Sequence, residues 1–185
     1  MNNKKSCWGQ TLPDYVLHYH NTVWGKPCHD DVTLFKMLCM EAFQAGLSWN
    51  IVLKLETQLE VAFDGFDPEI IAAYDKNKAD ELMCADGMIK NRKKIEAVLN
   101  NAKRYLDVQK EFGSFDNYIW SFADYKVIDN KFTSSTQLPA STPLSDKIAK
   151  DLKKRGFKFL GTVTVYAFMQ SMGLVNDHLI DCEYR

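Results

Sequence analysis

Apolar residues recur every three or four positions along almost the whole chain, and this spacing limits the fold more than any other feature. Residues 91–111 are the clearest case, because their apolar side chains would share one face of a long helix. These are Ile95, Val98, Leu99, Ala102, Tyr105, Leu106 and Val108. The alternation of apolar and polar residues that marks a half-buried strand is absent, so the sequence predicts an all-α fold.

Capping residues and glycines divide this pattern into separate helices. Asp30 or Asp31 is placed to cap a helix that ends near Gly46, and Asp67-Pro68 combines a cap with a proline at the first helical position. A first helix is expected around Tyr19. The other helices are expected over residues 31–45, 48–63, 67–74, from 77 onward, 91–111, 114–122, 144–155 and 162–172, with a Ser-, Thr- and Pro-rich loop over 126–143.

The chain of 185 residues is long enough for one domain with a buried core, and we expect residues 1–185 to form a single unit. No apolar run reaches the 18 residues that a membrane helix needs, and the polar N-terminus lacks the apolar stretch of a signal peptide. We therefore expect a cytoplasmic protein. Its five cysteines favour thiols or metal ligands over disulfides.

Charge is nearly balanced overall but unevenly distributed. Lys plus Arg number 23 and Asp plus Glu 24, which excludes binding to nucleic acid or membrane by bulk positive charge. Residues 55–87 carry nine acids and two bases. In contrast, 88–104 carry six bases and one acid, and 145–158 carry six bases and two acids. Such runs are either solvated helix faces that balance one another or a locally basic surface.

Residues that bind metals stand near both ends of the chain. Cys7 and His20 lie near its start, and His178 and Cys182 lie four positions apart at its end, where a helix would place them on one face. Two Cys and two His form a common ligand set for structural zinc, and such a site would tie the terminal segments together. From spacing alone, the alternative that these residues are unrelated stays open.

Glu41 is a carboxylate among apolar neighbours on the expected 31–45 helix. A buried carboxylate needs either a partner or a ligand. With the aromatic residues Tyr19 and Trp49 it could form a flat-walled pocket for a planar cation. The alternative is an aromatic core with one surface glutamate, and the pattern alone favours that alternative.

The segment from Leu152 to Thr162 joins two expected helices by a glycine-bounded turn. Backbone N–H groups at Gly161 and Thr162 could hold a phosphate at the start of the second helix. Four bases stand close in sequence: Lys153, Lys154, Arg155 and Lys158. This is the pattern of a helix–hairpin–helix that binds the DNA backbone, and a plain corner between two helices is the alternative.

Taken together, these motifs resemble the type I 3-methyladenine DNA glycosylases of bacteria, in the helix–hairpin–helix glycosylase superfamily. The matching segments run in order along the chain. They are Cys7-Trp8-Gly9, Tyr19-His20 with Trp24-Gly25, Glu41 with Gly46-Leu47-Ser48-Trp49, Gly87 to Ile95 with Arg92 and Lys94, Trp120-Ser121-Phe122, Lys153 to Gly161, and Phe168 to Cys182 with Asn176-Asp177-His178.

The resemblance implies a DNA repair enzyme that flips a damaged nucleotide out of alkylated double-stranded DNA and hydrolyses its N-glycosidic bond. The expected base is 3-methyladenine, with 3-methylguanine as a further candidate, and no strand cleavage is expected. The fold would be an all-α glycosylase fold whose helix–hairpin–helix lies near 145–173, and the protein would act as a monomer.

The resemblance also implies roles for particular residues. Cys7, His20, His178 and Cys182 match the family's structural Zn²⁺ ligands. The base-binding residues would be Tyr19, Glu41 and Trp49, with Glu41 also the expected catalytic residue. Lys158, Gly161 and Thr162 would contact the DNA backbone. We further predict that Leu47 wedges into the base stack at the lesion, and we keep Asp177 as a doubtful second catalytic candidate.

Four positions depart from the family's pattern. Val16 stands where a tyrosine is usual, so one pocket tyrosine is missing or is replaced by Tyr15. Ala167 replaces a frequent serine, Asn21 a frequent aspartate, and Phe159 the usual first glycine of the hairpin. None of these changes removes Glu41, Trp49 or the four metal-ligand candidates.

Two other functions remain as alternatives. One is a zinc-stabilised DNA-binding module without catalysis, which would release no base. The other is a helical adaptor between proteins, which would show no salt-dependent binding to DNA.

Overall fold

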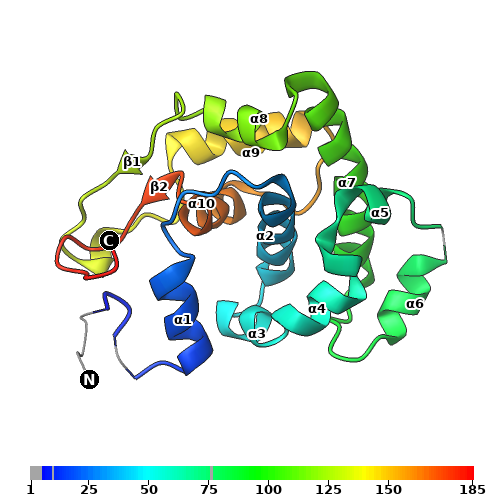
Figure 1. The fold of residues 1–185 in the computed structure, drawn as a ribbon, viewed down its shortest axis with the longest axis horizontal. Coiled ribbons are helices and arrows are strands. Elements are labelled where there is room, and N and C mark those ends of the chain that lie inside the picture. The colour runs from blue at the N-terminus through cyan, green and yellow to red at the C-terminus, as the bar shows by residue number, and fades with distance from the viewer. Residues whose placement is uncertain (1–5, 10, 76) are drawn as a thin grey trace.

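The computed structural model describes residues 6–9, 11–75 and 77–185, and helices dominate this part of the chain (Figure 1). The prediction of a helical fold is therefore confirmed. The helices are α1 (Asp14–Thr22), α2 (Asp31–Gln44), α3 (Trp49–Lys54), α4 (Glu56–Ala62), α5 (Pro68–Ala72), α6 (Lys78–Cys84), α7 (Arg92–Phe112), α8 (Phe115–Ser121), α9 (Pro143–Lys154) and α10 (Thr162–Ser171). Short 3-10 turns span η1 (Asp64–Phe66) and η2 (Ser135–Gln137).

Helix α2 runs through the centre of the molecule and packs against α3, α7, α8 and α10. Its side chains are buried on nearly every side, as expected of a helix that is apolar all round. Asp30 caps its N-terminus as predicted, because the Asp30 carboxylate accepts a hydrogen bond from Thr33 N at 2.8 Å. This central position explains why Glu41, near the end of α2, is buried.

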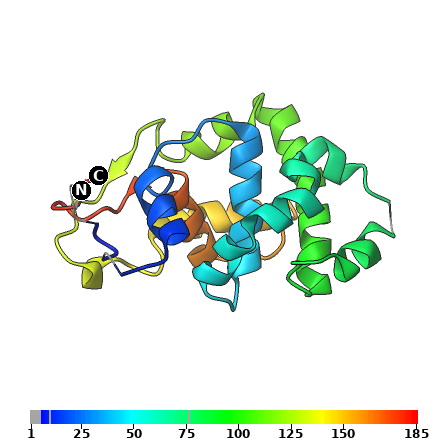
Figure 2. The ribbon, with the colours of Figure 1, turned by 60° about the horizontal axis from the view of Figure 1, so that its bottom comes forward.

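The two ends of the molecule are formed by different segments of the chain (Figures 1 and 2). At one end α5 and α6 pack on α7. This brings the acidic segment 55–87 beside the basic segment 88–104, and Arg92 forms an ion pair with Asp80. Part of the charge segregation is therefore surface pairing between neighbouring helices. At the other end the described N-terminal residues lie beside the C-terminal segment (Figure 2).

Two details differ from the sequence prediction. Residues 48–63, expected as one helix, form α3 and α4, because Leu55 (φ −99°, ψ 4°) leaves the helical conformation between them. The apolar spacing continues across the break, since Val52 and Leu59 both pack into the core. The second difference is a parallel pair of strands, β1 (Ile128–Asp129) and β2 (Val175–Asn176). Two-residue strands are too short to show alternation.

Helices α9 and α10 pack against each other and are joined by a turn over residues 155–161. A capping box at Thr142 starts α9, with Ser145 as its reciprocal partner. Both helices agree with the predicted bounds to within a residue or two.

Among the described residues, no helix has both the length and the apolar composition needed to cross a membrane.

Candidate functional site

A cavity of about 190 Å³ opens beside α1, α2, α3 and α10. Its lining residues are Trp8, Tyr19, Trp24, Glu41, Gln44, Trp49, Ala167 and Gln170. The structure thus brings together Tyr19, Glu41 and Trp49, the three residues singled out from the sequence. Because pockets for drug-sized ligands span roughly 300–1,000 Å³, this volume suits a group the size of one base.

Aromatic rings form most of the cavity wall. The Tyr19 and Trp49 ring centroids lie 5.2 Å apart with their planes at 57°. Trp8 extends the wall, with its ring centroid 4.9 Å from Trp24 and 5.9 Å from Tyr19. Flat apolar faces of this kind favour a planar ligand by stacking.

Glu41 is the acidic group of the cavity, and its side chain is only 3% exposed. Burial raises the pKa of Glu41 to about 8, although the nearby Ser171 hydroxyl acts in the opposite direction. Its Oε2 atom is buried and has no hydrogen-bond partner among the described residues. A buried carboxylate atom without a partner destabilises a fold, so its retention points to a ligand that completes the site.

Tyr19 and Trp49, two of the residues that line the cavity with Glu41, carry hydrogen-bond donors. Burial, reinforced by the charge of Glu41, raises the pKa of Tyr19 well above its ordinary value, so the Tyr19 hydroxyl stays neutral and able to donate. Trp49 Nε1 is also buried without a partner among the described residues. The cavity therefore offers an unsatisfied acceptor and an unsatisfied donor between aromatic walls.

Sequence reasoning did not assign Gln44 and Gln170 to the site. Each lies three positions after another lining residue on its helix, Gln44 after Glu41 on α2 and Gln170 after Ala167 on α10. Because residues three apart share a helix face, this spacing was a signal that could have identified both.

The departures from the family pattern affect this cavity unequally. Val16 is buried in the core. The Tyr15 hydroxyl donates to Asn50 Oδ1 at 2.5 Å, and Tyr15 does not belong to the cavity lining. Tyr15 therefore does not replace the missing tyrosine in this structure. Ala167, in contrast, lines the cavity directly.

Asp177, the doubtful second catalytic candidate, is 1% exposed and is not part of the cavity lining. Its carboxylate accepts hydrogen bonds from Tyr166, Gln170 and Asn130. An acid with both oxygens engaged by donors is poorly placed to activate water.

A second cavity of about 240 Å³ adjoins the first and shares Glu41, Gln44 and Ala167 with it. Leu47 lines this second cavity opposite Val163 and Thr164 of α10. The turn that carries Leu47 is held by Lys94, which is 5% exposed and donates to Phe43 O at 2.7 Å and Ala45 O at 2.5 Å. Lys94 therefore caps the C-terminus of α2 and is not part of a basic surface.

A side chain of α7 holds the turn between α9 and α10 by hydrogen bonds to its backbone. Asn101, 1% exposed, donates to Lys158 O at 3.0 Å and accepts from Lys158 N at 2.8 Å. The Lys158 side chain stays exposed, as does Phe159, whose φ of +60° is the left-handed conformation that the usual glycine adopts more easily. Phe159 therefore adopts the left-handed backbone conformation that is usual for the glycine at this position.

One of the basic residues around this turn differs from the sequence prediction. Arg155 was grouped with the phosphate-binding bases, but it forms ion pairs with Glu111 at 2.7 Å and Asp151 at 2.6 Å. The Thr162 hydroxyl donates to Asp146 Oδ1 at 2.5 Å. The groups that remain for a phosphate are Lys153, Lys154, Lys158 and the backbone N–H groups that begin α10 after Gly161.

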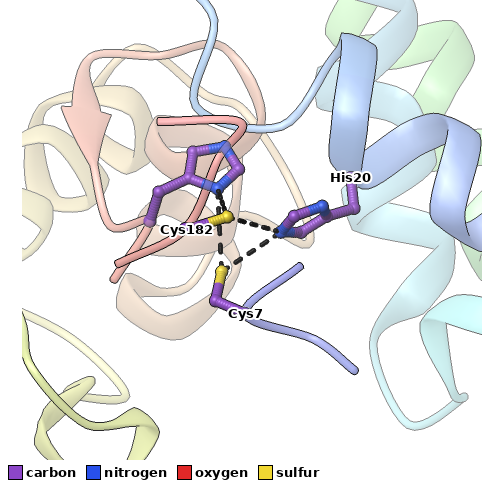
Figure 3. Close-up of side chains that lie close together, drawn as sticks. Cys7, His20 and Cys182 are labelled. Atoms are coloured by element: carbon purple, nitrogen blue, oxygen red, sulfur yellow. Dashed lines mark hydrogen bonds between the residues drawn. The ribbon is translucent and has the colours of Figure 1, made fainter. Parts of the chain in front are cut away.

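Four potential metal ligands converge where the terminal segments meet (Figure 3). One ligand atom from each of Cys7, His20, His178 and Cys182 lies within 4.8 Å of every other. The sulfur-to-nitrogen distances are 3.1 and 3.6 Å from Cys7 to His20 and His178, and 3.9 and 3.4 Å from Cys182. A tetrahedral zinc ion would hold sulfur and nitrogen about 3.6 Å apart, so this donor set fits such an ion.

Hydrogen bonds orient both imidazole rings toward the centre of the cluster. His178 Nε2 lies 2.9 Å from Trp24 O, which requires a proton on Nε2 and leaves Nδ1 free to bind a metal. His20 Nδ1 lies 2.7 Å from Asn21 Oδ1, which leaves His20 Nε2 facing the cluster. Asn21, which stands where the family often has an aspartate, therefore orients the His20 ring.

Burial disfavours charge on the metal-free cluster. It raises the pKa of Cys7 to about 11 and lowers the pKa of His178 to about 4. A divalent cation would reverse the effect on the thiols by stabilising thiolates. A helix would place His178 and Cys182 on one face, but in the structure they lie in a turn after β2, in which Cys182 N donates to Leu179 O at 2.9 Å. Gly25 permits the close approach, because a Cβ there would meet the His178 ring at 2.8 Å.

Comparison with known proteins places this geometry in context. The methyladenine glycosylase family model matches residues 8–185. The chain is 46% identical over 166 residues to the DNA-3-methyladenine glycosylase of Haemophilus influenzae, covering 90% of each chain. It is 41% identical over 175 residues to DNA-3-methyladenine glycosylase 1 of Escherichia coli K12, covering 95% of this chain and 93% of that one.

One of the solved structures similar to this chain contains a bound base. The fold matches a Tyr-to-Phe variant of 3-methyladenine DNA glycosylase I in complex with 3-methyladenine. The TM-score is 0.94 at 38% identity, and the match covers 100% of this chain and 97% of the other.

Proposed function

The chain belongs to the methyladenine glycosylase family and acts as a base-excision repair glycosylase on 3-methyladenine in DNA, and we propose that its aromatic cavity with Glu41 carries this activity. The observation that supports this site most strongly is the buried, unpartnered Glu41 Oε2 between aromatic walls. A flipped base that carries positive charge and stacks on Trp49 would supply what this carboxylate lacks.

Methylation at N3 makes the adenine of a nucleotide cationic, and the reaction uses that charge. The bond between N9 and the C1′ atom of deoxyribose breaks, its electron pair goes to N9, and the base leaves neutral. Water adds to C1′ and loses a proton, which leaves an abasic site. Because the leaving base needs no added proton, the cavity requires no strong general acid.

Glu41 favours the cationic nucleotide over normal bases when it enters the cavity, and it stabilises positive charge on the sugar as the bond breaks. Tyr19 donates a hydrogen bond from its neutral hydroxyl, and Trp49 stacks on the ring. A flipped normal base gains the stacking but not the charge interaction. The residues that line the cavity include no lysine to attack C1′, so the DNA strand should remain uncut.

The α9–turn–α10 segment acts as a helix–hairpin–helix that binds the DNA backbone. Lys158 and the N–H groups at Gly161 and Thr162 contact phosphates, and Asn101 keeps the turn in its binding conformation. Leu47, on the turn next to the base cavity, wedges into the gap left by the flipped nucleotide.

The Cys7, His20, His178 and Cys182 cluster holds a structural Zn²⁺ ion. Its two Cys and two His are ordinary zinc ligands, and both His rings are oriented toward the cluster by hydrogen bonds. When bound, the ion would neutralise the buried thiolates and join the two terminal segments next to Trp8 and Trp24, which line the cavity. We place this enzyme in the cytoplasm as a monomer.

The direct test incubates alkylated duplex DNA with the protein and identifies the released bases and the state of the strand. We expect free 3-methyladenine and intact strands that carry abasic sites. Duplex binding without base release would identify a DNA-binding module, and no binding to DNA would identify an adaptor.

Two variants test the DNA-contacting residues. Lys158→Ala should weaken duplex binding and lower the slope of log affinity against log salt by about one. Leu47→Ala should slow base release from duplex while release from single-stranded DNA changes little. Unchanged values in either variant would remove that residue from the DNA interface.

A further inference from the structure

Asp177 is a buried carboxylate that the proposed reaction does not use. It is hydrogen-bonded to Gln170, one of the residues that line the base cavity. Its Oδ2 accepts from the Tyr166 hydroxyl and from Gln170 Nε2, each at 2.7 Å. Its Oδ1 accepts from Asn130 Nδ2 at 2.6 Å. All three partners donate, so this pocket is built to hold a carboxylate, although Asp177 is only 1% exposed.

The carboxylate determines which way the Gln170 amide faces. Gln170 Nε2 is the atom that donates to Asp177 Oδ2, so the NH₂ group of Gln170 faces Asp177. The carbonyl oxygen, Oε1, is then the part of the amide left for a ligand, on a side chain that lines the base cavity. The backbone is held as well, because Gly25 N donates to Gln170 O at 2.8 Å.

We propose that Asp177 and Gln170 together determine base specificity: Asp177 fixes Gln170 with its carbonyl oxygen toward the flipped base, where it accepts a hydrogen bond from an exocyclic amino group. This inference rests on the proposed function and identifies the edge of the purine that the site selects. Gln170 is a base-binding residue, and Asp177 is a positioning residue that acts through it.

The chemistry favours a 6-amino purine over a 6-oxo purine. Adenine carries a donor at C6, whereas guanine and hypoxanthine carry an acceptor there. The Gln170 carbonyl can only accept, so a 6-oxo group facing it would leave two acceptors opposed and desolvated. A site built to pair a donor rejects an analogue that lacks it much more strongly than a purely apolar site does.

Free bases give a test that does not depend on DNA binding. 3-Methyladenine carries an amino group at C6, whereas 3-methylhypoxanthine carries an oxo group there and a proton on a ring nitrogen. The dissociation constants of both bases can be measured by calorimetry with the zinc-loaded full chain. We expect the wild-type protein to prefer 3-methyladenine by on the order of 10- to 100-fold. In Gln170→Met, which keeps the side-chain volume but removes the acceptor, this preference should fall about tenfold.

Two further variants make the result specific to the fixed carbonyl. Gln44→Met removes the other glutamine of the cavity, which forms no hydrogen bond to a carboxylate among the described residues. It should weaken both bases alike and leave the preference unchanged. Gln170→Glu keeps an oxygen acceptor at this position, because a proton shared with Asp177 leaves the other oxygen facing the cavity. It should retain the preference, and it gives a second reading if Gln170→Met folds poorly.

The outcomes separate this inference from the proposed function. A wild-type protein that binds both bases equally, a Gln170→Met variant that keeps the full preference, or a Gln170→Glu variant that loses it would each overturn the role of Gln170. None of these results would affect the release of 3-methyladenine from alkylated DNA. Failure of the wild-type protein to release that base would overturn the proposed function instead.

Discussion

The burial of Glu41 predicts that this carboxylate destabilises the empty enzyme, and that Glu41→Gln will make the fold more stable in a pH-dependent way. The pKa of Glu41 rises from an ordinary value of 4.5 to about 8 because of burial. Between these two pH values the native state holds a proton that the unfolded chain has lost. The contribution of Glu41 to stability therefore falls as pH rises through this range.

The size of the effect follows from the pKa difference. At 1.36 kcal/mol per pH unit, ionised Glu41 costs the native state at most about 5 kcal/mol relative to the unfolded chain. The Glu41 side chain is almost fully buried, so solvent screening reduces this value little. From pH 5 to pH 9, the stability of Glu41→Gln relative to wild type should increase by roughly 4 kcal/mol.

Urea unfolding of both proteins at pH 5, 7 and 9, with Zn²⁺ in excess, measures this difference. The change with pH is the informative quantity, because any constant effect of the amide on packing cancels from it. Other titrating groups, including the cluster thiols, are common to both proteins.

The same urea titrations with free 3-methyladenine added relate the stability cost of ionised Glu41 to its ligand. Free 3-methyladenine is neutral and should offset only part of the cost by hydrogen bonding to Glu41. If Glu41→Gln has the same relative stability at pH 5 and pH 9, or becomes less stable at high pH, Glu41 is not a desolvated acid and the argument for its role fails.

Three further predictions concern the cluster, the hairpin and the pH dependence of the reaction. Cys182→Ser should abolish zinc binding. In urea titrations at free Zn²⁺ about a hundredfold above the wild-type Kd, it should also lower the free energy of unfolding by at least about 2.7 kcal/mol. Cys84→Ser, at an exposed position, should have neither effect. Asn101→Ala should cost about 1–3 kcal/mol of stability and weaken duplex binding, more than Asn100→Ala does. Asn100→Ala removes the hydrogen bonds from Asn100 to Gly156 O and Asn101 Oδ1 but keeps both hydrogen bonds between Asn101 and Lys158. Because the cationic base needs ionised Glu41, kcat/KM for base release should rise about tenfold per pH unit up to the pKa of Glu41 at about 8 and then level off. A flat profile between pH 6 and 8 would contradict this role of Glu41.

Helix positions could be predicted from sequence because they depend on local spacing and caps. The Asp30 cap on α2, Asp67 with Pro68 at the start of α5, and Asn91 before α7 all lie where the residue types place them. The break at Leu55 could not be predicted, because both flanking segments continue the same apolar period. The β1–β2 pair depends on contacts between residues more than 40 positions apart, which no local pattern contains.

The candidate site was predicted less evenly. Glu41, Tyr19 and Trp49 meet as expected, but from residue types alone a surface glutamate was the favoured interpretation, and only tertiary packing shows the buried atom without a partner. The pairing of Arg155 with Glu111, across 44 positions, removed a base that sequence proximity had assigned to the phosphate site. The orientation of Gln170 depends on Asp177, and that hydrogen bond forms only when β2 returns beside α10.

The role of Glu41 in base release is the central claim, and single-turnover kinetics test it most directly. Wild type and Glu41→Gln are each mixed in excess with alkylated duplex at pH 8.5, and the release of 3-methyladenine is followed at saturation. The account predicts that Glu41→Gln releases the base at least about 100-fold more slowly, as when other preorganised electrostatic groups are removed, while duplex affinity stays within about threefold. Equal release rates in the two proteins would contradict it.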